Sequence, residues 1–171
     1  MSEKKTKVNF NFYVVIGSIL LFTVLYIAFM SLSFVNLGSS LTNFTGFMLL
    51  EFDVEGVNAL SIINLVLASI IIVLAIVNIV FSRINVKTFV VRLIMLIQVI
   101  FGLALAIITI ILFVKIGNLF NILNYRPTVI GGSTISPQRR SYAAGAILHL
   151  IMGILTALSS ALIFFVQKSE N

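Results

Sequence analysis

Hydrophobic positions fall into four long, largely apolar runs, at about 8–35, 57–81, 89–114 and 142–166. Each run has at least the ~20 residues that a membrane-spanning helix needs. In hydrocarbon the backbone must satisfy its hydrogen bonds within each segment, so the runs are expected to be helices. None shows the alternating pattern of a membrane β-barrel. The sequence therefore predicts an all-α integral membrane protein, a four-transmembrane-helix bundle in which 1–171 form one polytopic domain.

Along three of the runs, small and polar residues, with a few larger apolar ones among them, recur at spacings of three and four, which keeps them on one helix face. These residues are Ser61, Asn64, Ala68, Ile71, Ala75 and Asn78, then Met95, Gln98, Gly102, Leu105 and Thr109, then Ala146, His149, Gly153, Thr156 and Ser160. An average spacing of 3.5 predicts left-handed packing at roughly +20°. Gly102 and Gly153 should permit close approach of the helices. The first run shows only Gly17, Ser18 and Ala28, and is expected to lie more peripherally.

His149 is the single histidine of the chain. Counted at ~1.5 Å per residue, it lies ~10 Å below the outer boundary, and Asn64 comes out at ~9 Å. Thr109 falls at a similar level, so Asn64, Thr109 and His149 are expected to form a polar cluster. Gln98 and Asn78 lie nearer the cytoplasmic side and are candidates for a second pair.

An ionisable residue inside a membrane helix suggests a functional site, and histidine titrates near neutral pH. However, none of the four runs contains Asp or Glu. A single imidazole without a second histidine or a carboxylate cannot make an ordinary zinc site. The favoured interpretation is therefore a neutral His149 that bonds helix to helix. Proton or ligand chemistry remains the alternative.

Two outer loops, at about 36–56 and 115–141, carry acidic and basic residues respectively. Their charged candidates are Glu51, Asp53, Glu55, Arg126, Arg139 and Arg140. The acidic group could bind a cation such as Ca²⁺. Because the EF-hand spacing is absent, contact with the arginines of the other loop is favoured. Arg139 and Arg140 fit anionic headgroups or an acidic partner as well as a role in capping the entrance to the fourth helix.

Composition and charge support a membrane location. Only 9% of the residues are charged and 60% are hydrophobic, whereas a soluble domain has about 25% charged residues. The basic residues sit at the ends of the runs, which argues against a nucleic-acid partner. On one side lie Lys4, Lys5, Lys7, Arg83, Lys87, Arg92 and Lys168, and on the other only Lys115, Arg126, Arg139 and Arg140. This excess predicts that both termini are cytoplasmic, in a cell membrane for which the residue usage suggests a bacterial plasma membrane.

Motifs that would indicate an enzyme are missing from the sequence. It has no cysteine, no H-E-x-x-H, no G-x-S-x-G and no phosphate-binding loop. No catalysis, cofactor or metal is therefore expected. The sequence favours an accessory, stabilising or protective subunit of a larger membrane assembly, whose partners are the lipid bilayer and another membrane protein or a further copy of itself. The alternative is a homo-oligomeric channel or small carrier whose polar lumen surrounds His149 and uses Asn64, Thr109, Gln98 and Asn78.

Overall fold

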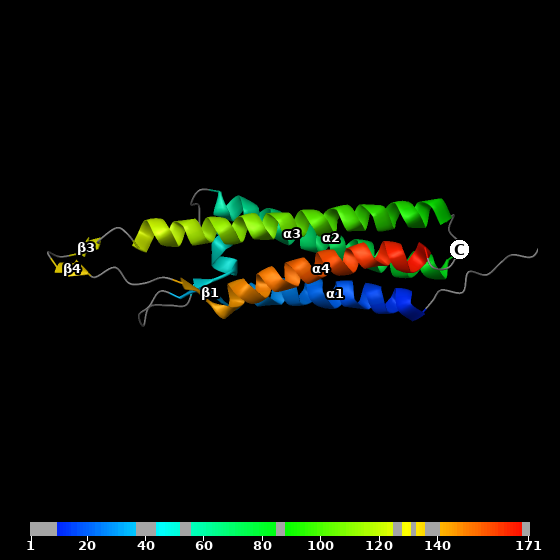
Figure 1. Cartoon of the computed structure of the whole chain (residues 1–171), viewed down its shortest axis with the longest axis horizontal. Helices are drawn as coiled ribbons and strands as arrows, with labels where there is room; N and C mark the ends of the chain where they lie inside the picture. The colour runs from blue at the N-terminus through cyan, green and yellow to red at the C-terminus, as the bar shows by residue number, and fades with distance from the viewer. Residues whose placement is uncertain are drawn as a thin grey trace, which may run out of the picture.

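Four long helices lie side by side in an elongated bundle (Figure 1). They are α1 (Phe10–Phe29), α2 (Val57–Arg83), α3 (Thr88–Asn124) and α4 (Ala144–Lys168). The computed structural model describes residues 10–36, 44–51, 56–84, 88–124, 128–130, 133–135 and 141–168. Each helix contains a segment long and apolar enough to cross a membrane, so the chain is an all-α, multi-pass membrane protein.

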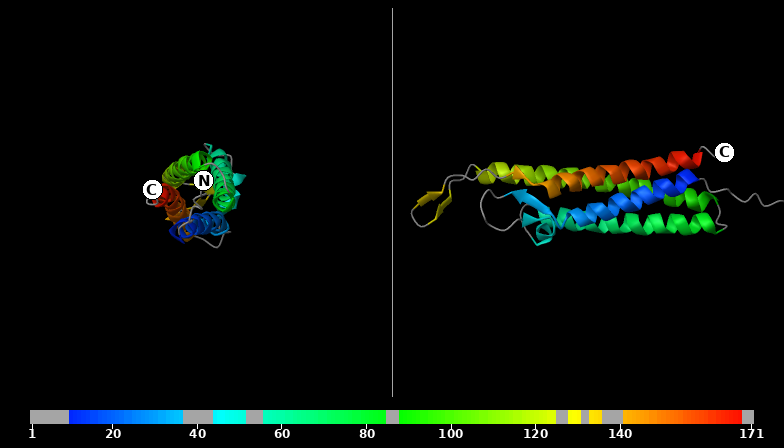
Figure 2. Two further views of the ribbon diagram at one scale, coloured as in Figure 1. Left: turned by 90° about the vertical axis from the view of Figure 1, so that its right-hand side faces the viewer. Right: turned by 90° about the horizontal axis from the view of Figure 1, so that it is seen from below.

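The helices run antiparallel to their neighbours and follow one another around the bundle (Figure 2). The main contacts are α1 with α2, α2 with α3, α3 with α4, and α4 with α1. Helices α2 and α4 therefore occupy diagonal corners. The three stripes of small and polar residues on α2, α3 and α4 are all buried in the bundle interior.

The first helix is not peripheral, so that prediction is wrong. It buries residues at spacings of four and three, namely Phe12, Ile16, Ile19, Thr23, Tyr26 and Met30. Gly17 and Ala28, on which the prediction rested, are exposed. The error arose because small residues were taken as the mark of packing, whereas α1 packs through large apolar side chains and one tyrosine.

A small sheet closes the end of the bundle away from the start of α1 and the end of α4, called the outer end below. Strand β1 (Ser33–Asn36) pairs antiparallel with both β2 (Phe44–Thr45) and β5 (Ser141–Tyr142). The first helix was expected to continue to about 35, but it ends at Phe29 because the following residues enter this sheet. For the same reason the fourth helix begins at Ala144 rather than 142. Pairing satisfies backbone N–H and C=O groups of these segments that would otherwise lack partners within the chain.

The third helix continues past 114 to Asn124, into a segment expected to be a loop. The sequence beyond Lys115 stays largely apolar, and the helix ends at Asn124, ahead of Pro127 in the sequence. A proline disfavours the helical conformation of the residue that precedes it. Further along lies a hairpin of β3 (Thr128–Ile130) and β4 (Ser133–Ile135). A 3₁₀ turn, η1 (Phe47–Leu50), packs near the start of α2.

Candidate functional site

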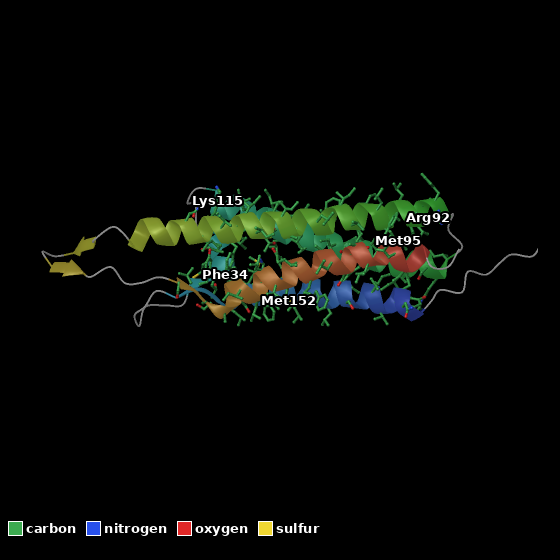
Figure 3. The ribbon with its side chains drawn as sticks, viewed as in Figure 1. Phe34, Arg92, Met95, Lys115 and Met152 are labelled. Carbon is green, nitrogen blue, oxygen red and sulfur yellow. The ribbon has the colours of Figure 1, made fainter. Side chains whose placement is uncertain are left out.

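The imidazole of His149 contacts two aromatic rings in the outer part of the bundle. It stacks on Tyr26 of α1, with ring centroids 3.7 Å apart and planes at 27°. Phe34 of β1, at the outer end of the bundle in Figure 3, approaches edge-on, with centroids 5.2 Å apart. The three residues join α1, the outer sheet and α4.

A hydrogen bond fixes which ring nitrogen of His149 carries the proton. Its Nδ1 lies 2.9 Å from the backbone oxygen of Tyr26. A carbonyl oxygen only accepts, so Nδ1 must donate, and Nε2 of the neutral ring is left as an acceptor. A charged ring would need an acceptor at Nε2 as well, and that atom is buried with no partner in the described part of the chain. The geometry therefore fits the neutral ring.

The hydroxyl of Tyr26 extends the same cluster to α3. It lies 2.8 Å from Oγ1 of Thr109, which itself donates to the backbone oxygen of Leu105 at 2.7 Å. Because the single proton of Thr109 is used in that bond, Tyr26 is the donor between the two hydroxyls. A Cβ atom at Gly153 would lie 3.2 Å from both Thr109 Oγ1 and the Tyr26 ring. Gly153 therefore makes room for this contact.

Of the expected cluster, Thr109 and His149 are brought together through Tyr26, whereas Asn64 makes no hydrogen bond to either. Asn64 is fully buried on α2, and both polar atoms of its amide lack a partner among the described residues. The sequence interpretation missed Tyr26. Its place in the regular spacing of large residues along α1 was the signal that could have identified it.

A second polar layer lies nearer the other end of the bundle. The amide nitrogen of Asn78 on α2 donates to the side-chain oxygen of Gln98 on α3, so the expected pair is present. Gly102 packs against Ser160, since a Cβ there would come within 2.8 Å of the serine Cβ. In the described chain, four atoms of this region have no hydrogen-bond partner: Asn78 Oδ1, Gln98 Nε2, Thr156 Oγ1 and Ser160 Oγ.

Of the six charged candidates in the outer loops, the structure describes Glu51. Glu51 is exposed next to η1. The other five candidates lie outside the described residues, and these are Asp53, Glu55, Arg126, Arg139 and Arg140. Among the residues that the structure describes, no three His, Cys, Asp or Glu side chains are grouped to hold a metal ion.

Chemically, the interior offers neutral donors and acceptors only. None of the buried residues in the described ranges is Asp, Glu, Lys or Arg. Comparison with family models, curated proteins and solved structures finds no match for this chain. Its function is therefore inferred from its own geometry.

Proposed function

We propose that this protein is a non-enzymatic accessory or stabilising subunit of a larger membrane assembly. The proposal rests on the contacts that His149 makes inside the bundle. The residue best suited to proton or ligand chemistry is held by a stacked ring and a backbone hydrogen bond, both from Tyr26. Its contacts fasten α4 to α1, which is a packing role.

The exposed face of α1 supports the proposed contact with a second membrane protein. Gly17 is exposed, and a Cβ atom there would meet nothing within 4 Å. This glycine is thus not needed for packing within the chain. Small residues on a membrane helix allow the backbone of another helix to approach closely. Ala28 is exposed on the same helix, whereas the exposed positions of α3 between Leu93 and Val114 carry large aliphatic side chains suited to lipid.

Topology and location complete the proposal. The start of α1, the end of α2, the start of α3 and the end of α4 lie at one end of the bundle (Figure 1). Arg83 and Arg92 are exposed at that end, and basic residues favour the cytoplasmic side. We propose that both termini are cytoplasmic, in a bacterial plasma membrane. The spacing of the buried residues supports left-handed packing of the helices.

A second candidate function is a homo-oligomeric channel or small carrier. One observation favours it: polar atoms without partners in the described chain occur at several levels of the interior, from Asn64 and His149 to Asn78 and Gln98. Residues that line a wet path would have this property. The bonds that Tyr26 makes to His149 and Thr109 favour the first candidate, because they link α1 directly to α4 and α3 in the outer part of the bundle.

The experiment is purification of the tagged protein from its native membrane in mild detergent, followed by native mass spectrometry. We expect a complex with a second membrane protein in fixed stoichiometry. Gly17→Leu should abolish that complex without unfolding the bundle, because space around Gly17 is open.

The matched control is Ile107→Phe, which adds bulk to an exposed position of α3. It should leave the complex intact. Recovery of the protein only as a homo-oligomer would contradict the subunit proposal. Solute flux into liposomes, compared between the wild type and His149→Leu, would then test the channel.

A further inference from the structure

We infer that Asn64 and His149 form an internal site that binds water molecules in the outer half of the bundle. The inference goes beyond the proposed function, because it does not depend on any partner protein. Its starting point is burial: Asn64 is 0% exposed and His149 is 2% exposed. Even so, both polar atoms of the Asn64 amide and the Nε2 atom of His149 lack hydrogen-bond partners in the described chain.

The two side chains lie at the same level of the bundle. Asn78 on α2 bonds to Gln98 on α3, so these two residues are level with each other. Asn64 lies as far before Asn78 in the sequence as Leu112 lies after Gln98. Helices α2 and α3 are antiparallel, so Asn64 is level with Leu112.

The same count applies to α4. Gly153 on α4 lies against Thr109 on α3, so these two residues are level with each other. His149 lies as far before Gly153 in the sequence as Phe113 lies after Thr109. His149 is therefore level with Phe113, only about 1.5 Å along the axis from the level of Asn64. The two residues belong to the buried faces of diagonally opposite helices.

The imidazole cannot turn to find another partner. Its Nδ1 is committed to the carbonyl of Tyr26, and its plane is held against the Tyr26 ring. Nε2 is thus a fixed acceptor. The Asn64 amide offers two N–H donors and an oxygen acceptor.

These groups define the ligand. A molecule bound here must donate to Nε2 and accept from the Asn64 amide, and it must be neutral because the described interior holds no charged residue. Water does both, and buried waters typically make about three hydrogen bonds to such unsatisfied groups.

The single histidine makes the test direct. Protein labelled with ¹⁵N-histidine and reconstituted in a lipid bilayer gives one imidazole, observed by solid-state NMR. We expect a protonated Nδ1 and an unprotonated Nε2 that receives magnetisation from water protons. In Asn64→Leu this transfer should be lost, and the Nε2 resonance should move toward that of a free acceptor.

Ser61→Ala is the matched control. Ser61 lies one turn away on α2, is equally buried, and donates its hydroxyl proton to the Val57 carbonyl at 2.8 Å. The water contact of Nε2 should persist in this variant. The wild-type spectrum decides the presence of water at Nε2 even if Asn64→Leu does not fold, and Asn64→Ser then serves as the milder substitution.

Four results would overturn the inference: a protonated Nε2, no transfer from water in the wild type, transfer from the Asn64 amide protons instead of water, or a contact that Asn64→Leu leaves unchanged.

Discussion

Tyr26 binds His149 twice, through its ring and through its own backbone carbonyl. The ring centroids lie 3.7 Å apart, and the imidazole Nδ1 donates to the carbonyl oxygen at 2.9 Å. Because the carbonyl belongs to the same residue as the stacked ring, the two contacts fix both the orientation of the imidazole and its protonated nitrogen. This double contact joins the outer halves of α1 and α4.

Replacement of His149 by leucine should destabilise the bundle while leaving its fold unchanged. The variant replaces the imidazole by an apolar side chain of similar size, and it loses the ring stack and the hydrogen bond. Together these are expected to be worth about 1–2 kcal/mol, given ~0.5–1.5 for an aromatic pair and ~0.6 for a hydrogen bond in a membrane. Unfolding in a detergent titration measures the change. Ile147→Leu, at an exposed position of the same helix, should have no effect, and equal stability of the two variants would contradict the prediction.

The bond between Tyr26 and Thr109 should show as a coupling energy. Tyr26→Phe removes the donor, Thr109→Val removes the acceptor, and the double variant removes both. Each single change should destabilise the protein, and the double change should cost less than their sum by about 0.6 kcal/mol, with ~1.7 as the upper end for such bonds. A double-mutant cycle of unfolding free energies provides the value. Strict additivity would show that the two hydroxyls do not interact.

Gly102 and Gly17 should differ in their sensitivity to substitution by alanine. Gly102→Ala places a Cβ within 2.8 Å of the Ser160 Cβ, whereas a Cβ at Gly17 meets nothing within 4 Å. Overpacking typically costs about 1–3 kcal/mol, so Gly102→Ala should lower the free energy of unfolding and Gly17→Ala should not. Adding Ser160→Gly to Gly102→Ala should restore part of the loss. Failure of this rescue would place the strain elsewhere.

High pH should weaken the packing of Tyr142 against α3 at the outer end of the bundle. Its hydroxyl donates to the backbone oxygen of Phe113 at 2.5 Å, and its ring stacks on Phe113 with centroids 3.9 Å apart. Burial raises the pKa of this phenol above its ordinary value. Below the ordinary pKa of about 10 both the folded and the unfolded protein keep the proton. As the pH rises above that value the unfolded state ionises first, so the stability contributed by Tyr142 is lost.

The measurement is the thermal midpoint at about pH 8 and about pH 11, on either side of the ordinary phenol pKa. The wild type should lose more stability over this interval than Tyr142→Phe, which has no proton to release. Lysines and the other tyrosines titrate in both proteins, so the difference isolates Tyr142. An equal loss of stability in the wild type and in Tyr142→Phe would show that ionisation of Tyr142 does not weaken this packing.

The sequence allowed the helical bundle and its interior stripes on α2, α3 and α4 to be predicted, because lipid leaves few alternatives for a long apolar segment. The pairing of Asn78 with Gln98 could also be anticipated, because antiparallel helices place residues of equal depth together. The sheet at the outer end could not. Ser33–Asn36 reads as a continuation of the first helix, and only its pairing with Phe44–Thr45 and Ser141–Tyr142 makes it a strand.

The sequence by itself determined that His149 lies in the bundle interior, close to the depth of Asn64, because periodicity and rise per residue set both face and depth. Thr109 lies about one helical turn away in depth, and Tyr26 bridges the difference. Tertiary structure alone decided which neighbour the imidazole meets. Its partner, Tyr26, lies on the helix with the weakest small-residue pattern, and the hydrogen bond uses a backbone carbonyl that carries no residue-specific signal. Contacts between distant segments depend on the rotation and tilt of whole helices, which the packing of all four fixes together.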